Sequence, residues 1–517
     1  NADTIVIAAG QSMTMTNNDA LIVNVENVTL GNGATVSLAG QTEAAGFTIT
    51  GGAGAETITG SNADDRINAG LGNDVVMGGI GADVLDGQAG FDTASYADVT
   101  LASSHGLTGI TGMGVNLSAT AVADAAIELA FGFRSGITTR GPVANLAASA
   151  AEYLGANAIT GATTDTLTGF EAVTGSALND YIVLGAGGMS ASGAAGADVL
   201  VGGSGADTID GGAGADVVLI SASADHVAGE VITGGDGTDT IRFTSTSAGT
   251  LTLQAGVTGV EEVEISDASG ANTRVGGTFQ STNESINASA LTYGITLTGN
   301  DGNNILTGSA FADQLIGGAG VDTIVADDAD TLVDGDGGDV SSTQYRPNDV
   351  MILADDATFM AAELANIEKV ELASGVNLTV DYTDTRAYAA NHAIDQVTGV
   401  SGGAVEKLIV TGASTNSATA ITNVFKNAVT LINVSLQYVG GTDDERVIGT
   451  AGADTFNGGS GADTLEGGAG SDVLTGAAGA DTFFIANAFS NTTFDTITDF
   501  VISSVAGSSD IVNVTAF

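Results

Sequence analysis

The chain has 517 residues, of which 76 are Gly and 61 are Asp or Glu against 11 Lys plus Arg, so its formal net charge is −50. A charge of this sign and size repels phosphate, which excludes binding to nucleic acid or to an anionic membrane surface. The chain has no Cys, which excludes disulfides, thiolate metal sites and Cys nucleophiles. Because 43 % of the residues are apolar, the chain can still bury a core. No apolar run reaches the roughly 18 residues that a membrane-spanning helix needs.

Residues 1–50 contain two strand patterns about 20 residues apart, Asp3 to Ile7 and Val25 to Val28. Similar pairs return at 239–243 with 260–263 and at 349–353 with 367–370. Gly, Asn, Asp and Ser separate the two members of each pair, as expected for turns. These patterns predict wide, metal-free β-solenoid coils over residues 1–50, 240–298 and 340–439.

Residues 51–95 form the first of four arrays of nine-residue units. Its units are GGAGAETIT, GSNADDRIN, AGLGNDVVM, GGIGADVLD and GQAGFDTAS. Each unit begins with a Gly-containing turn sequence and has an apolar residue two places after an acidic one. The acidic residues at the sixth positions are Glu56, Asp65, Asp74, Asp83 and Asp92. A flexible linker would not maintain this register, so the array predicts a repeating structural unit.

Residues 96–174 interrupt this rhythm with Ala-rich sequence. The pattern predicts helices over Ala121 to Phe131 and over Val143 to Leu154, in a small helical insertion that also holds linker strands. A further short helix is predicted over Thr358 to Ala365.

Three more arrays occupy residues 175–239, 299–339 and 440–484. Met189 stands at the sixth position of one unit in the second array, and the third array slips by one residue at Asp330. The candidate ligands of these arrays are Asp180, Asp198, Asp207, Asp216, Asp225, Asp239, Asn304, Asp313, Asp322, Asp339, Glu445, Asp454, Asp463, Asp472 and Asp481.

The chemistry of one unit predicts a metal site. Six Gly-rich residues can form a tight turn, and the next three can form one short strand with its middle side chain inside. Two units then make one coil, and stacked coils lie about 4.8 Å apart, so the sixth position lies over the sixth position 18 residues later. Two carboxylates at that distance repel unless a cation lies between them. Because the ligands are carboxylate and carbonyl oxygens in a flexible turn, the expected cation is calcium.

The four arrays resemble the RTX, or hemolysin-type, calcium-binding repeats. This resemblance implies an all-β fold, a right-handed parallel β-roll or β-solenoid with calcium-binding turns. In that family each ion lies between units i and i+2, held by both sixth-position carboxylates and by carbonyl oxygens of the turns. Carried over, this implies about ten calcium ions. The implied pairs are Glu56 with Asp74, Asp65 with Asp83, Asp74 with Asp92, Asp180 with Asp198, Asp198 with Asp216, Asp207 with Asp225, Glu445 with Asp463, Asp454 with Asp472, Asp463 with Asp481 and, without a full charge complement, Asn304 with Asp322.

The resemblance extends beyond the arrays. Phe91 to Tyr96 and Asp165 to Ser176 resemble linker phrases of large secreted RTX proteins, and Ser285 to Leu291 resembles a phrase of Caulobacter-type RTX surface-layer proteins. Residues 485–517 are similar to the strand-forming, uncleaved secretion signals of type I exporters. These similarities imply secretion and a location at the bacterial cell surface.

A catalytic centre is not evident in the sequence. Gly399 to Gly403 matches the G-x-S-x-G expression around Ser401, but neither a strand-turn-helix context nor a paired His and acid accompanies it. We therefore expect no enzyme. We expect a calcium-dependent extracellular structural protein that forms a surface layer or filament by self-assembly, with a cell-surface polysaccharide as a further partner. The alternatives are a calcium-stiffened adhesin or ligand-binding stalk and the C-terminal portion of a secreted RTX toxin or enzyme.

Overall fold

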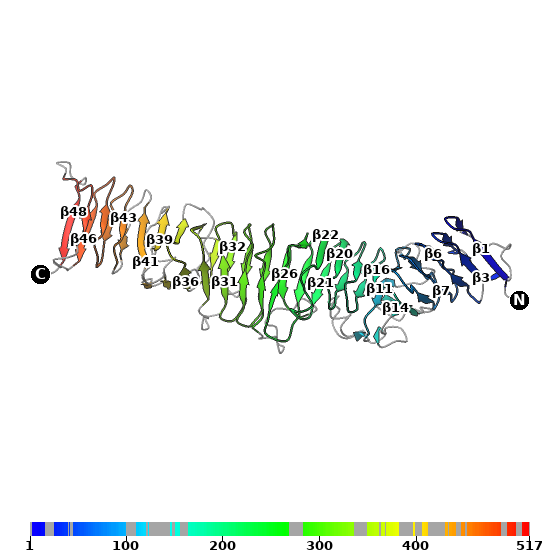
Figure 1. Cartoon of the computed structure of the whole chain (residues 1–517). Coiled ribbons are helices and arrows are strands. Elements are labelled where there is room, and N and C mark those ends of the chain that lie inside the picture. The colour runs from blue at the N-terminus through cyan, green and yellow to red at the C-terminus, as the bar shows by residue number, and fades with distance from the viewer. Residues whose placement is uncertain are drawn as a thin grey trace. The chain divides into compact units, whose positions relative to one another are not determined.

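The computed structural model describes residues 3–15, 25–39, 41, 45–99, 110–119, 122–123, 145–146, 150–155, 164–267, 283–335, 349–360, 363–367, 369–381, 396–398, 406–411, 430–432, 434–440, 446–449, 452–486, 494–502 and 509–515. Its contacts divide the chain into two units, Asn1–Asn272 and Thr273–Phe517. Each unit is a stack of β-solenoid coils whose strands pair mainly in parallel with the next coil (Figure 1). The described residues include no apolar helix with the length that a membrane crossing requires.

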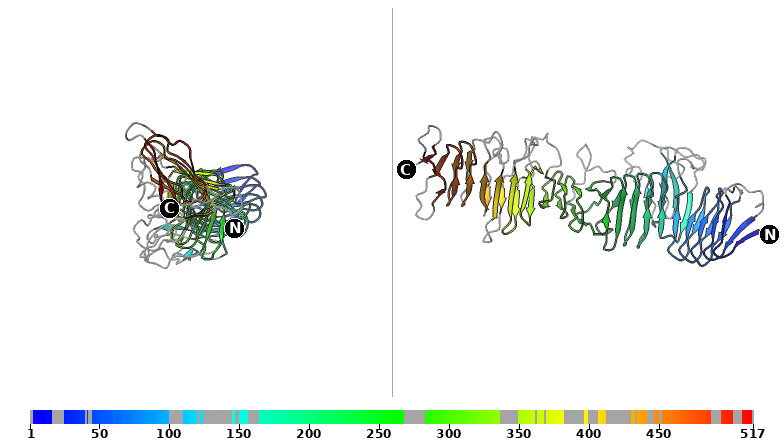
Figure 2. Two further views of the ribbon diagram at one scale, coloured as in Figure 1. Left: turned by 90° about the vertical axis from the view of Figure 1, so that its left-hand side faces the viewer. Right: turned by 90° about the horizontal axis from the view of Figure 1, so that it is seen from above.

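The first unit has two ladders of parallel strands, and each coil contributes one strand to each ladder (Figure 2). The first ladder contains β1 (Asp3–Ile7), β3 (Val25–Leu30), β5 (Thr48–Thr50), β7 (Arg66–Asn68), β9 (Val84–Asp86), β15 (Thr164–Thr168), β17 (Tyr181–Val183), β19 (Val199–Val201), β21 (Val217–Ile220), β23 (Thr240–Phe243) and β26 (Glu262–Ile265). The second contains β2 (Ser12–Thr14), β4 (Thr35–Ser37), β6 (Thr57–Thr59), β8 (Val75–Met77), β10 (Thr93–Ser95), β16 (Ala172–Thr174), β18 (Ser190–Ser192), β20 (Thr208–Ala213), β22 (Val231–Asp236) and β25 (Val257–Thr258). Strand β24 (Thr250–Thr252) also belongs to this unit.

The second unit repeats this construction. Its ladders are β27 (Ser285–Asn287), β29 (Ile305–Thr307), β31 (Thr323–Ala326), β33 (Val350–Leu353), β36 (Lys369–Leu372), β38 (Gln396–Thr398) and β40 (Thr430–Ile432), and β28 (Thr296–Thr298), β30 (Gln314–Ile316), β32 (Leu332–Asp334) and β35 (Leu364–Ala365). Two more are β34 (Ala357–Met360), β37 (Asn377–Asp381), β39 (Glu406–Thr411), β41 (Val434–Val439), β43 (Thr455–Asn457), β45 (Val473–Thr475) and β47 (Thr496–Ile497), and β42 (Arg446–Ile448), β44 (Thr464–Glu466), β46 (Thr482–Ala486) and β48 (Ile511–Thr515).

The core is a column of middle residues from the three-residue strands. Ile49, Ile67 and Leu85 pair in register in one ladder and are fully buried. In the other ladder Ile58 and Val76 also pair in register and are fully buried. Because side chains alternate across a strand, one apolar residue per strand points inward while its two neighbours face outward. The prediction of one strand in each nonapeptide, with its middle side chain inside, is confirmed in the first array. It is wrong for the described unit 220–228, where no strand follows Asp225.

The insertion after the first array adds two strands to one ladder only. Strand β14 (Ala150–Gly155) pairs antiparallel with β15, and it pairs antiparallel with β11 (Ile110–Asn116), which pairs parallel with β17. In the other ladder β10 pairs directly with β16, and β16 with β18. The parallel solenoid therefore continues through residues 164–174 although the chain departs from it between these coils.

The predicted helices are not found among the described residues, so that part of the fold prediction is wrong. Strands β12 (Val122–Ala123), β13 (Asn145–Leu146) and β14 occupy the described parts of the first two predicted helices, and the remaining residues lie outside the described ranges. Strands β34 and β35 replace the third helix. Local helix propensity is a weak preference, and the hydrogen bonds of β34 to β37 and of β14 to its two neighbours override it.

Candidate functional site: stacked carboxylates in the turns

The sixth-position carboxylates are stacked along the turns by hydrogen bonds to the main chain. The N–H of Asp180 donates to Oδ1 of Asp198 (2.7 Å), and the N–H of Asp198 donates to Oδ1 of Asp216 (2.8 Å). All three side chains are buried. The parallel register produces this contact, because Val199 pairs with Val217 and so places the residues before them in adjacent coils.

The same N–H to carboxylate contact links most of the pairs expected from the 18-residue spacing. The contacts join Glu56 to Asp74 (2.7 Å), Asp65 to Asp83 (2.8 Å), Asp74 to Asp92 (2.8 Å), Asn304 to Asp322 (2.8 Å), Asp454 to Asp472 (2.9 Å) and Asp463 to Asp481 (2.9 Å). The structure therefore brings these predicted pairs together in the order that the sequence indicates.

The second oxygen of these carboxylates, Oδ2, is the atom that indicates a metal site. Oδ2 is buried without a hydrogen-bond partner in Asp74, Asp83, Asp92, Asp198, Asp207, Asp216, Asp239 and Asp472. A charged oxygen that is buried without a partner costs roughly several kcal/mol of folding free energy, unless a cation or a hydrogen-bond donor contacts it. These residues therefore fit a bound cation better than a metal-free turn.

Carbonyl oxygens converge on the same place. A Cβ added to Gly211 would collide with the carbonyl oxygen of Gly234 and lie 2.6 Å from Oδ2 of Asp216. Gly193 has the same relationship to Gly211 and Asp198. Glycine at the first position therefore leaves room where a carboxylate oxygen and a carbonyl oxygen of the next coil face each other.

The ligand set contains oxygen only. In the described part of the chain no group of three or more His, Cys, Asp or Glu side chains meets in a way that would hold a metal. A cation here would thus be held by carboxylates together with main-chain carbonyls. Hard oxygen ligands in a flexible turn suit calcium, whereas magnesium needs near-octahedral geometry.

Burial also makes these carboxylates difficult to ionise without a cation. Desolvation, with the charges of neighbouring carboxylates adding to it, raises the pKa of Asp83 and of Asp198 to about 8. The same main cause raises the pKa of Asp74 and of Asp216 to about 6. A metal ion at Oδ2 would oppose this shift, because a nearby positive charge favours the ionised form.

One predicted pair, Asp207 with Asp225, is wrong. Thr208 pairs with Val231, so the register places Glu230 opposite Asp207, and the charge of Glu230 adds to the burial that raises the pKa of Asp207. Asp225 lies in the longer turn before Glu230 and accepts a hydrogen bond from the Ser221 hydroxyl (2.8 Å). The coil is longer here than 18 residues, so counting along the sequence selected the wrong acid.

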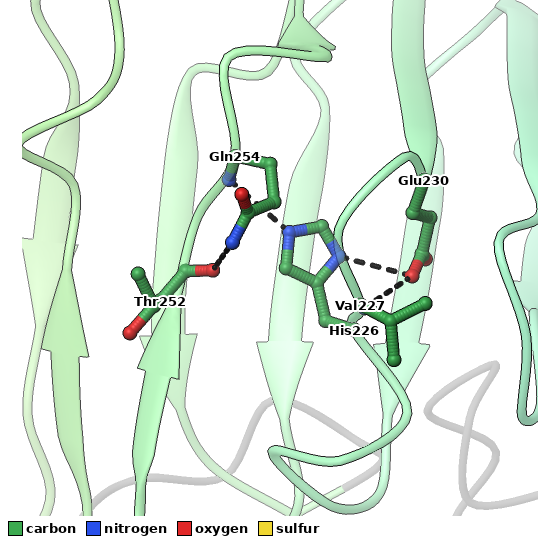
Figure 3. Close-up of polar contacts among 5 residues, drawn as sticks. All are labelled: His226, Val227, Glu230, Thr252 and Gln254. Carbon is green, nitrogen blue, oxygen red and sulfur yellow. Dashed lines mark hydrogen bonds and ion pairs between the residues drawn. The ribbon is translucent and has the colours of Figure 1, made fainter.

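A buried histidine organises this longer turn (Figure 3). Nε2 of His226 accepts the main-chain N–H of Gln254 (3.3 Å), so Nδ1 carries the ring proton and faces Oε2 of Glu230 at 3.2 Å. The same oxygen accepts the N–H of Val227 (3.1 Å). His226 thus connects Glu230 to the next coil.

On the other side of Asp207, Met189 stands where an acid is expected. The N–H of Met189 donates to Oδ1 of Asp207 (2.8 Å), so the backbone of this coil keeps the stacked arrangement without a second carboxylate.

The third array shows the one-residue slip that the sequence predicts at Asp330, and it departs from the predicted register only at the next coil. The N–H of Asp313 donates to Oδ1 of Asp330 (3.3 Å), and the N–H of Asp322 donates to Oδ1 of Asp349 (2.8 Å). Asp349 therefore takes the place predicted for Asp339. Asp339, Glu445 and Ser401 lie outside the described residues.

Further acids complete the stacks where a coil outside the arrays follows. The N–H groups of Asp83, Asp92, Asp239, Asp472 and Asp481 donate to carboxylates at Asp165, Glu171, Glu261, Asp495 and Asp510, respectively. Sequence reasoning missed these five. Their common signal is an acidic residue at or just before the start of a strand that pairs with the array strand.

Comparison with known families agrees with this geometry. The model of the RTX calcium-binding nonapeptide repeat, HemolysinCabind, matches residues 50–85, 59–94, 192–225, 298–330, 439–474 and 457–484. These matches lie in the four arrays. A comparison with curated proteins found no significant match. The chain thus carries RTX calcium-binding repeats within a parallel β-solenoid.

Proposed function

We propose that this chain is a secreted structural protein that folds when it binds calcium and that self-assembles at a bacterial cell surface. The observation that carries the proposal is the column of buried sixth-position carboxylates whose Oδ2 atoms face carbonyl oxygens of the next coil. When its carboxylates are ionised, such a column supports a solenoid only if cations neutralise it.

The calcium requirement supports an extracellular location. Extracellular calcium modules typically bind with dissociation constants of roughly 0.1–1 mM, which suits a protein that folds after export. RTX repeat proteins are typically secreted by type I systems. Folding only outside the cell would also keep the chain export-competent in a compartment with little free calcium.

The proposed role is structural and not catalytic. In the described residues the buried acids bind main-chain N–H groups of neighbouring coils, as Asp198 does with Asp180. One oxygen of such a carboxylate therefore holds the solenoid together, and the other is available to a cation in the turn, so both serve stability.

Exposed apolar side chains near the C-terminal strands support self-assembly. Phe494, Phe500, Val501, Ile502 and Ile511 are large, apolar and exposed, and Ile502 is 85 % exposed. Exposed apolar residues gathered in one part of a protein commonly mark a contact surface. A contact with little charge would also let two highly acidic chains approach each other.

Circular dichroism of the purified chain tests calcium-coupled folding. At pH 9, where the metal-free carboxylates are ionised, we expect coil-like spectra in excess chelator and β spectra on addition of millimolar calcium, with magnesium at the same concentration as the control. A β spectrum that is unchanged in chelator would refute calcium-dependent folding.

Light scattering against calcium concentration tests self-assembly separately. We expect the intact chain to form large species in calcium and Ile502→Asp to form fewer of them. Leu71→Asp is the control, because Leu71 is 55 % exposed in the first array, away from these residues in sequence. A folded chain that stays monomeric in several millimolar calcium would favour the adhesin stalk or the portion of a larger secreted protein.

A further inference from the structure

In three of the described turns a serine donates both its N–H and its hydroxyl to the sixth-position carboxylate. In residues 60–65 the N–H of Ser61 donates to Oδ2 of Asp65 (2.5 Å) and the Ser61 hydroxyl donates to Oδ1 (3.0 Å). The Ser61 hydroxyl oxygen in turn accepts the N–H of Ala63 (3.2 Å). Oδ1 of Asp65 also accepts the N–H of Phe47 (2.6 Å) in the preceding coil. Both oxygens of this carboxylate are therefore hydrogen-bonded inside the protein.

The same arrangement recurs in residues 175–180 and 308–313. Ser176 donates from its N–H to Oδ2 of Asp180 (2.5 Å) and from its hydroxyl to Oδ1 (2.7 Å). Ser309 makes the same two bonds to Asp313 (2.5 and 3.0 Å). The hydroxyl of each serine accepts the N–H two residues later, at 3.1 Å in both turns. We call 60–65, 175–180 and 308–313 the latched turns.

The remaining turns with buried, unpartnered Oδ2 atoms have another backbone, and we call them open turns. In the open turn 202–207, which ends at Asp207, Gly203 has φ +117° and Gly205 has φ +135°. Even non-glycine residues at the second position of open turns adopt positive φ, as Gln88 (+70°) and Ala194 (+74°) do. The second and fourth residues of the latched turns, such as Ser61 and Ala63, are not among the described residues with positive φ.

An uncharged counterpart of the latched turns shows that this hydrogen-bonding arrangement needs no charge at the sixth position. The N–H of Asn300 donates to Oδ1 of Asn304 (2.8 Å), and Nδ2 of Asn304 donates to Oδ1 of Asn300 (3.1 Å). Oδ1 of Asn300 also accepts the N–H of Gly302 (2.7 Å), as the serine hydroxyls do in the latched turns. A turn of this shape can thus close around an amide, which binds calcium less strongly than a carboxylate does.

We propose that the latched turns are closed by serine in place of calcium, and that they hold the first coils of arrays 1, 2 and 3 in register before any ion binds. Calcium is confined to the open turns, where Oδ2 has no donor. The latches lie in the first or second unit of their arrays, so each one presents a formed turn on which the next coil can stack. This inference rests on the proposed calcium binding and adds which turns require it.

A calcium count on paired variants of the full chain tests the assignment. Asp65→Asn/Asp180→Asn alters two latched turns, and Asp83→Asn/Asp198→Asn alters the open turns one coil further along. At saturating calcium, native mass spectrometry should show the wild-type ion number for the first variant and a loss of about two ions for the second. Equal losses in both would overturn the proposal, and so would a loss of two ions in the latch variant even if the open-turn variant fails to fold.

Serine variants test whether the hydroxyls replace the ion or bind it. Ser61→Ala/Ser176→Ala/Ser309→Ala should bind as many ions as the wild type but need more calcium to fold. Ser204→Ala is the matched control, because Ser204 is exposed at the third position of an open turn. A loss of three ions in the triple variant would show that the serines are calcium ligands and would overturn the proposal.

Hydrogen exchange in chelator separates this inference from the proposed function. Peptides covering 60–68, 175–183 and 308–316 should exchange more slowly than those covering 193–201 and 211–219, and the serine variant should abolish the difference. A wild type that binds no calcium would refute the proposed function, and equal exchange of all these peptides in chelator would refute the latch by itself.

Discussion

The main-chain N–H of Asp74 donates a 2.8 Å hydrogen bond to Oδ1 of Asp92, 18 residues further along the chain. This bond uses one oxygen of the Asp92 carboxylate to connect successive coils and leaves the other, Oδ2, buried and without a donor. The same side chain therefore has two tasks: one oxygen fixes the register of the ladder, and the other is available to a cation. Stability and calcium binding are consequently linked at each open turn.

The stability of the metal-free protein should fall as the pH rises. Burial raises the pKa of Asp83 and Asp198 to about 8, whereas the ordinary pKa of Asp is about 4. Between about pH 4 and pH 8 the folded state therefore binds more protons than the unfolded state. The contribution is fully present below about pH 4 and is lost as the pH rises through 8. In chelator we expect β structure at pH 5 and its loss by pH 9, measured by circular dichroism.

In calcium the pH dependence should reverse, because the ion requires the ionised carboxylate and displaces its proton. The calcium affinity should therefore increase up to about pH 8. A metal-free protein that becomes more stable between pH 5 and pH 9 would contradict the role assigned to Asp83 and Asp198.

Glu230, and not Asp225, should contribute to the calcium site of Asp207. The strand register places Glu230 opposite Asp207, whereas Asp225 binds the Ser221 hydroxyl. We expect Glu230→Gln to lose one ion or to weaken one site about tenfold, which corresponds to about 1.4 kcal/mol. Asp225→Asn is the matched control and should leave the ion number unchanged, measured by calorimetric titration. The opposite result would restore the pairing expected from sequence spacing.

Two glycines of nearly equal φ should differ sharply in their tolerance of alanine. Gly235 (φ +116°) lies against the carbonyl oxygen of Gly212, so a Cβ there would collide with the backbone. Gly187 (φ +106°) has open space around the same position. Both substitutions cost about 1 kcal/mol in backbone strain, and Gly235→Ala should cost clearly more in thermal unfolding monitored in calcium. Equal losses would mean that neighbouring coils are not packed this closely.

His226→Ala should destabilise the second array by about 1–3 kcal/mol, because it removes the ring that faces the buried Glu230 carboxylate and leaves the Gln254 N–H without a partner. Ser223→Ala, in the same turn but exposed, should change stability little. Chemical unfolding at saturating calcium gives the comparison. A His226→Ala variant as stable as the Ser223 variant would show that the contacts in Figure 3 do not support this turn.

Much of the solenoid could be predicted from its period. A strand triplet such as Val84 to Asp86 follows each acidic sixth position, and Leu85 is the buried residue of its triplet. The helices expected from Ala-rich sequence were wrong, because the pairing of β14 with β11 and β15 is made between distant segments that local propensity does not report.

The sequence by itself determined the nine-residue unit, the acidic sixth position and the oxygen-only chemistry of the turns, because these depend on neighbouring residues and on a constant period. Only the tertiary structure decided which acids meet. Ladder hydrogen bonds align strands wherever the intervening turn ends, so Glu230 replaces Asp225 and Asp349 replaces Asp339. It also decided how each carboxylate is satisfied. Ser61 closes on Asp65, whereas the next coil leaves Oδ2 of Asp83 without a donor, and that difference arises from the backbone conformation of the two turns.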